Sequence, residues 1–191
     1  METLQQIWRK LADEGYETDK GSVHSYISVY EEILSPYRDT AKNILEIGLF
    51  NGHSLRMWNE YFTKADVHGI DCSDQPHGGM ADLRPMIEEG WNIHILDAEN
   101  ADKVKEVFGG MEFDVIIDDA GHHKEQQEVL YSVFKSYLKR DGIYIIEDIQ
   151  DIDYNKRDFE TIDRNKSVEI VDRRHINGRF DDVLVIIKDI V

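Results

Sequence analysis

Short apolar runs alternate with longer amphipathic stretches along the 191 residues of this chain. The runs are rich in Val, Ile and Leu, a pattern typical of strands that are buried on both faces of a parallel sheet. The stretches between them repeat apolar residues three and four positions apart, as helices do. This alternation is typical of α/β proteins built from βαβ units. Strands are therefore expected at about 43–48, 66–71, 91–96, 113–118, 142–147, 167–172 and 183–188.

Helices are expected at about 1–14, 23–35 and 52–63 and after Glu125, where Val129, Leu130, Val133, Phe134, Tyr137 and Leu138 follow helical spacing. The last two expected strands are joined by about eleven residues without a helical pattern. Such a link suits an antiparallel pair better than a parallel crossover. The sequence thus predicts an α/β, Rossmann-like fold with helices on both faces of a seven-stranded sheet. That sheet should be mostly parallel and end in an antiparallel C-terminal hairpin. Residues 1–191 should form a single domain, with a helical segment at 1–35 over the crevice of the sheet.

The composition limits the partners of this protein. The chain has 39 acidic and 22 basic side chains, for a formal net charge of −17. Nucleic acid and anionic membranes attract cations, so neither is an expected partner, whereas a divalent metal and a neutral or cationic small molecule are compatible with this charge. Cys72 is the single cysteine, which excludes an internal disulfide and fits a reducing compartment. No secretory signal or long apolar run occurs, so a cytoplasmic protein without a membrane span is expected.

Acidic residues follow two of the expected strands at the point where each strand ends. Asp118-Asp119-Ala120-Gly121-His122 comes after one apolar run, and Glu147-Asp148 comes after the next. In an open α/β sheet the carboxyl ends of neighbouring strands open into a common crevice. Carboxylates gathered there repel one another unless protons or a cation relieve them, and a hard divalent ion prefers such oxygen ligands. The pattern predicts a metal-dependent enzyme.

A glycine-containing turn, Gly48-Leu49-Phe50-Asn51-Gly52, follows the first expected strand. Its spacing differs from the dinucleotide fingerprint, and Glu46 just before it would repel a phosphate. Asp71 ends the second strand, where a carboxylate can accept hydrogen bonds from ribose hydroxyls, and Asp97 ends the third, near the expected adenine. Together these positions favour an adenosine ligand without phosphate, of which S-adenosylmethionine is the commonest. Each glycine or aspartate alone would equally fit a tight turn or a helix cap.

These motifs resemble those of class I S-adenosylmethionine-dependent methyltransferases. More narrowly, the chain is similar to the metal-dependent sugar O-methyltransferases of macrolide biosynthesis, the mycinamicin and macrocin type; broadly similar proteins are often labelled cephalosporin hydroxylase. The glycine turn is shared by the whole class, whereas the two acidic motifs are specific to the narrower group. The matching stretches are Thr18–Ser22, His24–Tyr26, Leu45–Trp58, Ile117–His122 and Ile146–Asp148.

The resemblance implies a role for individual residues. Asp119, Glu147 and Asp148 match the carboxylates that hold Mg²⁺, and His122 matches the proposed general base, although the adjacent His123 leaves the choice of base open. The cofactor would be S-adenosylmethionine and the acceptor a hydroxyl of a sugar or glycosylated small molecule. An additional N-terminal domain of the mycinamicin type has no expected counterpart here. The residues expected to touch the cofactor or acceptor are Lys20, Tyr26, Glu46, Gly48, Ser54, Asp71, Asp97 and Asp118.

Several alternatives stay open at the level of sequence. Asp118-Asp119 would also suit a helix-capping loop, Glu147-Asp148 a solvated loop, and His122 an exposed surface position. A metal-dependent hydroxylase would fit the common family label, but no two-histidine-one-carboxylate spacing suited to iron is found. A catalytically silent adenosine-binding or assembly protein would share the same fold. Neither the acceptor nor the oligomeric state, for which a homo-oligomer is considered, follows from the sequence.

Overall fold

Seven strands form one sheet in the order β3-β2-β1-β4-β5-β7-β6 in the computed structural model, which describes residues 1–190. All seven expected strands are confirmed, and the largest difference in their bounds is an earlier start of β5. The strands are β1 (Asn43–Ile47), β2 (Asp66–Asp71), β3 (Asn92–Ile95), β4 (Phe113–Asp118), β5 (Leu138–Ile146), β6 (Lys166–Asp172) and β7 (Val183–Asp189).

The strand directions confirm the predicted Rossmann-like topology. Strands β1 to β5 pair in parallel, whereas β7 lies between β5 and β6 and runs antiparallel to both. The register places Ile47 beside Asp118, and Asp118 beside Ile146. Strands β1, β4 and β5 therefore end at the same level, and the residues that follow them emerge side by side.

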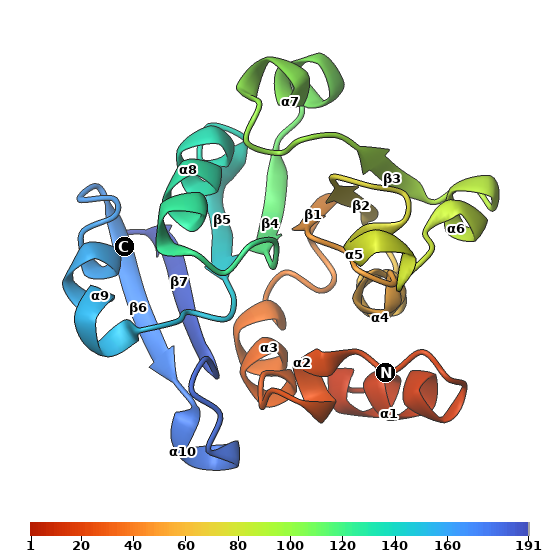
Figure 1. Cartoon of the computed structure of the whole chain (residues 1–191), viewed down its shortest axis with the longest axis horizontal. Coiled ribbons are helices and arrows are strands. Elements are labelled where there is room, and N and C mark those ends of the chain that lie inside the picture. The colour runs from red at the N-terminus through yellow and green to blue at the C-terminus, as the bar shows by residue number, and fades with distance from the viewer. Residues whose placement is uncertain (191) are drawn as a thin grey trace.

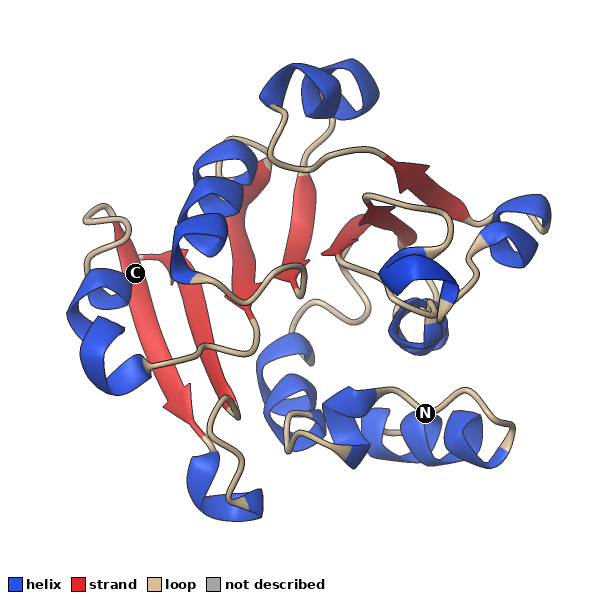
Figure 2. Cartoon of the chain, viewed as in Figure 1, coloured by secondary structure: helices blue, strands red, loops and turns tan. Residues whose placement is uncertain are grey.

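Helices cover both faces of this sheet (Figures 1 and 2). Residues of α1, α3 and α4 pack in one apolar core, and residues of α7, α8 and α9 pack in the other. The short helices α2, α5, α6 and α10 and the longer α7 and α9 add to the helices expected from the sequence. The helices are α1 (Leu4–Asp13), α2 (Asp19–Ser22), α3 (Ile27–Leu34), α4 (His53–Tyr61), α5 (Pro76–Gly79), α6 (Arg84–Glu88), α7 (Ala101–Phe108), α8 (Lys124–Phe134), α9 (Ile152–Glu160) and α10 (Arg174–Asn177).

Alternation along the strands divides the apolar residues between these two cores. In β4, Val115 and Ile117 face the core of α1, α3 and α4, whereas Ile116 faces the opposite core. This period of two is the strand geometry that places successive side chains on opposite faces. Because both faces are covered, the strands read as continuous apolar runs. Within residues 1–190, none of the helices combines the length and the apolar character that a bilayer crossing requires.

The N-terminal helices are fixed next to the carboxyl ends of the strands. A capping box formed by Thr3 and Gln6 starts α1, and such a box satisfies backbone N–H groups that would otherwise lack partners. The indole Nε1 of Trp8 donates a hydrogen bond to the carbonyl of Thr18, just before α2, at 3.3 Å. Gly21 leaves no room at this contact, because a Cβ there would lie 2.4 Å from Trp8 Cε2. These contacts hold α2 in one position over the sheet.

We expect the protein to lose stability in acid because two stacked histidines in the sheet are at least partly buried. His68 Nδ1 lies 3.5 Å from His94 Nε2, and both rings pack against Phe108. Burial lowers the pKa of both imidazoles, and the neighbouring His94 lowers that of His68 further. The unfolded chain then binds more protons, so the free energy of unfolding should decrease as the pH falls below about 6.5, the ordinary histidine value.

Urea unfolding at pH 7.5 and pH 5.0 tests this expectation. Replacing the buried imidazole with an apolar ring, His68→Phe, should reduce the difference between the two pH values. The same substitution at the exposed His175 is the control and should leave the difference unchanged. An equal pH dependence in wild type and His68→Phe would contradict the assignment.

Candidate active site

A cavity of about 830 Å³ opens at the carboxyl ends of β1, β2 and β4, a size typical of small-molecule sites. Its floor includes the turn Gly48–Asn51, and one wall is formed by residues 17–19 of the N-terminal segment. The loop Asp119–His122, which follows β4, forms another wall of the cavity. The segment around α2 therefore lies next to the glycine turn, as the sequence predicted.

Four of the residues expected to contact a cofactor line this cavity: Gly48, Ser54, Asp71 and Asp97. The Asp71 carboxylate accepts hydrogen bonds from the backbone N–H groups of Leu49, at 3.0 Å, and Phe50, at 3.3 Å. Asp71 thus shapes the glycine turn and also faces the cavity. A carboxylate offers about four acceptor positions, so capacity remains for a ligand's hydroxyl groups.

The other four expected contacts, Lys20, Tyr26, Glu46 and Asp118, are not among the residues that line the cavity. All four are buried and bonded to other protein groups. Asp118 accepts a hydrogen bond from the hydroxyl of Tyr144, and Glu46 accepts one from Ser54 Oγ at 2.8 Å. Glu46 therefore reaches the cavity through Ser54. Residue order along the chain could not separate groups that form the cavity wall from groups that lie behind it.

The ammonium group of Lys20 lies among carboxylates from three neighbouring strand ends. Its Nζ is 2.6 Å from Asp119 Oδ2, 2.8 Å from Glu147 Oε1 and 3.4 Å from Glu46 Oε1. The hydroxyl of Tyr30 on α3 also donates to Glu147 Oε1. Lys20 is fully buried, so this charge is balanced by protein groups and not by water.

A second group lies on the cavity side of Asp119. His122 Nε2 is 3.7 Å from Asp119 Oδ1 and 3.7 Å from Asp148 Oδ2. The His122 side chain keeps 34% of its surface exposed, whereas Asp148 is buried. Asp119 is shared, since one of its oxygens faces Lys20 and the other faces His122.

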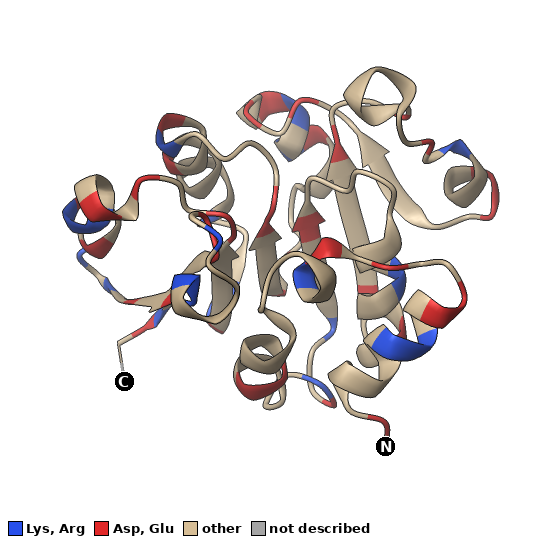
Figure 3. Ribbon diagram, turned by 60° about the horizontal axis from the view of Figure 1, so that its bottom comes forward, with Lys and Arg blue, Asp and Glu red and all other residues tan. Residues whose placement is uncertain are grey.

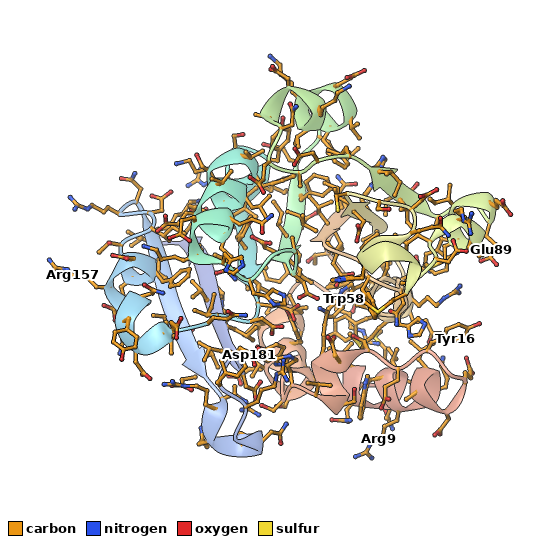
Figure 4. All side chains as sticks on the ribbon, viewed as in Figure 1. Arg9, Tyr16, Trp58, Glu89, Arg157 and Asp181 are labelled. Carbon is orange, nitrogen blue, oxygen red and sulfur yellow. The ribbon has the colours of Figure 1, made fainter. Side chains whose placement is uncertain are left out.

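Asp148 is held by two aromatic residues of the N-terminal segment. The Tyr26 hydroxyl donates to Asp148 Oδ1 at 2.8 Å, and His24 Nε2 lies 3.4 Å from Asp148 Oδ2. His24 also lies 3.7 Å from Asp182 through Nδ1. His24 was not among the site residues expected from the sequence, although it lies in one of the matching stretches. The partners come from segments more than a hundred residues away, and only the family-like stretch around His24 signalled its importance. Asp181, labelled in Figure 4, lies beside this group and accepts a hydrogen bond from Arg179.

Burial and mutual repulsion shift the pKa values of these groups. Burial disfavours the charge of Lys20, but the carboxylates of Asp119 and Glu147 outweigh it and raise its pKa well above the ordinary value. Burial also raises the pKa of Glu147 well above its ordinary value, and it raises that of Asp148 to about 7. One ammonium group does not neutralise the surrounding carboxylates, so a further cation or shared protons are required.

Potential metal ligands form two groups that share Asp119. Within residues 1–190, the ligand atoms of Asp119, His122 and Asp148 lie within 4.8 Å of one another, and so do those of Glu46, Asp119 and Glu147. The trio predicted from the sequence, Asp119, Glu147 and Asp148, is divided between these groups: Asp119 belongs to both, Glu147 lies with Glu46, and Asp148 lies with His122. Carboxylate oxygens with an unmet demand for positive charge fit a hard divalent cation.

The two adjacent histidines occupy different environments. His122 lines the cavity and faces two carboxylates, whereas His123 is exposed at the N-cap of α8. The carboxylate of Asp119 raises the pKa of His122, burial opposes this, and Asp148 adds to it. The geometry therefore favours His122 over His123 as a group that exchanges a proton with a ligand in the cavity.

Comparison with known proteins gives this site a context. No family model matches the chain. L-olivosyl-oleandolide 3-O-methyltransferase of Streptomyces antibioticus is 36% identical over 142 residues, which is 70% of this chain and 35% of that protein. Mycinamicin VI 2''-O-methyltransferase of Micromonospora griseorubida is 30% identical over 142 residues, again 70% of this chain and 34% of that protein. The chain spans about a third of the length of the curated relatives it matches.

Solved structures agree with these sequence matches. MycE methyltransferase of the mycinamycin biosynthetic pathway, in complex with Mg and SAH, superposes with a TM-score of 0.72 at 19% identity. That match covers 98% of this chain and 55% of MycE. An O-methyltransferase from Bacillus cereus in complex with SAH gives a TM-score of 0.66 at 15% identity, over 98% of this chain and 90% of that one. The fold is that of the class I methyltransferases. The resemblance predicted from the sequence is confirmed: the chain is similar to the macrolide sugar O-methyltransferases and has the fold of MycE.

The glycine turn of this methyltransferase fold leaves no space for a side chain at its first position. Gly48 has φ +87°, and a Cβ there would lie 2.1 Å from the backbone carbonyl oxygen of Asp119. The turn after β1 thereby approaches the acidic loop after β4 closely enough to join the cavity to the carboxylates.

Gly48→Ala should therefore destabilise the protein strongly. A left-handed alanine costs about 1–2 kcal/mol and overpacking about 1–3 kcal/mol more, which together should lower the melting temperature by roughly 10 °C. Gly15 is a matched control, because it has φ +90° but a Cβ added there would have no atom within 4 Å. Gly15→Ala should lower the melting temperature by only a few degrees. Equal losses in calorimetry would show that crowding at Asp119 is unimportant.

Proposed function

We propose that this protein is an S-adenosylmethionine-dependent, Mg²⁺-assisted O-methyltransferase acting on a hydroxyl of a sugar or glycosylated small molecule. The observation that carries the proposal is that Asp119 and His122 line a cavity whose floor includes the glycine turn, with the buried Asp148 close behind them. The sequence match to the oleandolide and mycinamicin O-methyltransferases supports it.

The cofactor would lie along Gly48, Ser54, Asp71 and Asp97, the expected contacts that line the cavity. Asp71 would accept hydrogen bonds from the ribose hydroxyls, and Asp97 would face the adenine. Phe50, which is 44% exposed, and the exposed Met80 also border the cavity and offer apolar surface to a ring. Neither residue was expected from the sequence to contact a ligand.

Asp119 and Asp148 would hold the divalent cation. Glu147, which is bonded to Lys20, would contribute negative charge to the site without contacting the cation directly. When bound, the cation would supply Lewis-acid stabilisation to the developing alkoxide of the acceptor. The acidic strand ends are visible in Figure 3, where aspartate and glutamate cluster at the centre of the molecule. A cation at this position would compensate the excess negative charge of the site.

His122 would accept the proton of the acceptor hydroxyl. Its imidazole combines partial exposure with carboxylate partners that orient the ring. Asp119 would hold His122 from one side, while Tyr26 and His24 keep Asp148 in place on the other. Binding and alignment of donor and acceptor would supply much of the remaining rate enhancement, because the sulfonium methyl group is already activated.

The wider biological setting forms part of the same proposal. We infer a cytoplasmic enzyme that acts on small molecules and not on nucleic acid or membranes, as the net charge of −17 and the single cysteine suggest. Residues 1–191 would form a single methyltransferase domain, and a homo-oligomer is the assembly considered. Mass spectrometry of a panel of free sugars and glycosylated macrolides, searched for the gain of one methyl group, tests the reaction. Cofactor binding without methyl transfer or any response to Mg²⁺ would instead support a silent adenosine-binding protein.

Asp71→Ala should weaken S-adenosylmethionine binding about ten- to a hundredfold, since a hydrogen-bonding charge is lost. Isothermal titration calorimetry measures this directly. Asp66, the exposed residue at the opposite end of β2, is the control, and Asp66→Ala should bind the cofactor like wild type. Unchanged affinity in Asp71→Ala would show that the adenosine binds at a different place.

His122→Ala should slow methyl transfer by about a hundred- to ten-thousandfold at neutral pH, the usual contribution of a positioned base. The wild-type rate should rise with pH, because the raised pKa of His122 keeps the imidazole protonated above the ordinary histidine value. That rise should disappear in His122→Ala. The neighbouring variant His123→Ala is the control and should stay active; an inactive His123→Ala beside an active His122→Ala would assign the base to His123.

Chelation should abolish methyl transfer while leaving cofactor binding largely intact, because the cation and cofactor would contact different residues. Activity with excess EDTA, followed by restoration with Mg²⁺, measures the first effect. Calorimetric titration of S-adenosylmethionine in EDTA measures the second. Full activity in excess chelator would refute the role of a metal.

A further inference from the structure

Lys20 differs from the other lysines in this protein that form ion pairs. Its side chain is 1% exposed, whereas that of Lys139, paired with Asp114 at 2.7 Å, is 44% exposed. The three carboxylates around Lys20 lie near or just after the carboxyl ends of strands β1, β4 and β5, which are neighbours in the sheet. Breaking a buried ion pair on one side leaves an uncompensated charge, which is far more costly than losing a surface pair.

The position of Lys20 is imposed by its surroundings. The helix α2 that carries it is pinned by the hydrogen bond from Trp8 to Thr18 and by the close approach of Gly21 to Trp8. On the far side, Tyr30 donates to Glu147 and packs against Trp58, which Figure 4 labels at the centre of the molecule. The ammonium group therefore has a fixed place, as a bound ion would.

Asp119 links this place to the cavity. Its Oδ2 faces Lys20 at 2.6 Å, so the carboxylate is oriented with Oδ1 toward His122. One oxygen of Asp119 is thus used internally, and the other is left for ligands in the cavity. Glu46 Oε1 is buried without a hydrogen-bond partner and lies 3.4 Å from Lys20 Nζ, so its nearest source of positive charge is the lysine.

We propose that Lys20 is a built-in counter-cation that holds the inner carboxylates together without metal and orients Asp119 for the cavity side. Lys20 is then a positioning residue, because it acts through Asp119. Its charge permits the acidic strand ends to fold close together before any divalent ion binds. The part of this inference that concerns a divalent ion rests on the proposed function; the part that concerns folding does not.

Charge rescue tests the folding part. Lys20→Met keeps an unbranched side chain but removes the charge, and it should lower the melting temperature by roughly 10 °C, as expected for breaking a buried pair. Adding Glu46→Gln removes one excess negative charge and should recover at least half of that loss. The control Lys64→Met breaks the exposed ion pair with Asp39 and should change the melting temperature by a few degrees at most.

A purely structural role would give a different result. If Lys20 only filled space, the double variant Lys20→Met/Glu46→Gln would be no more stable than Lys20→Met, and this would overturn the proposal. A Lys20→Met variant as stable as wild type would also overturn it. If Lys20→Met fails to fold, recovery of cooperative unfolding in the double variant supports the proposal. Failure of both variants to fold overturns it.

Metal binding tests whether the ammonium group takes the place of a divalent ion among the inner carboxylates. Without the ammonium group, the inner carboxylates attract a divalent ion more strongly, so Lys20→Met should bind Mn²⁺ about tenfold more tightly, or more, in titrations followed by electron paramagnetic resonance. Mg²⁺ should also raise its melting temperature more than that of wild type. Equal or weaker Mn²⁺ binding by a folded Lys20→Met would overturn this part. If wild type binds no Mn²⁺, the metal part of the proposed function fails, and the thermal rescue alone decides the role of Lys20.

Discussion

The structure around the candidate active site depends on the compensation of buried negative charge. Three strand ends deliver Glu46, Asp119 and Glu147 to one place, and the ammonium group of Lys20 lies within 3.4 Å of all three. Carboxylates in a low-dielectric environment repel one another strongly. The short N-terminal helix α2 therefore has a structural role although it has only four residues. It carries Lys20, whose ammonium group permits the carboxylates at the strand ends to lie close together.

The same arrangement separates an inner from an outer part of the acidic region. The inner part, with Glu46 and Glu147, is buried and bonded to Lys20 and Tyr30, whereas the outer part has His122 lining the cavity and the buried Asp148 behind it. Asp119 belongs to both. A ligand or cation on the outer side would therefore meet carboxylates whose orientation is already fixed, and preorganised groups of this kind are favourable for catalysis because they need not reorganise during the reaction.

The cavity joins this region to the glycine turn through close backbone contact. Gly48 permits the turn after β1 to touch the loop after β4, and Asp71 holds the turn by its backbone N–H groups. The class I methyltransferase fold thus contributes the cavity, and the acidic strand ends contribute the side chains on which the proposed reaction depends. Fold alone does not imply function, so the specific acidic residues carry the functional argument.

The sequence by itself determined the strands, the antiparallel position of β7 and the acidic strand ends, because apolar periodicity and chain order are local properties. It also determined that Gly48, Ser54, Asp71 and Asp97 face one cavity, since the ends of parallel strands open into a common crevice. Tertiary structure decided that Lys20 and Tyr26 bind carboxylates instead of lining the cavity, and that His24 meets Asp148. Those contacts join residues about a hundred or more positions apart. Which buried charged side chains pair with one another depends on how the chain folds in three dimensions, and no local sequence pattern specifies it.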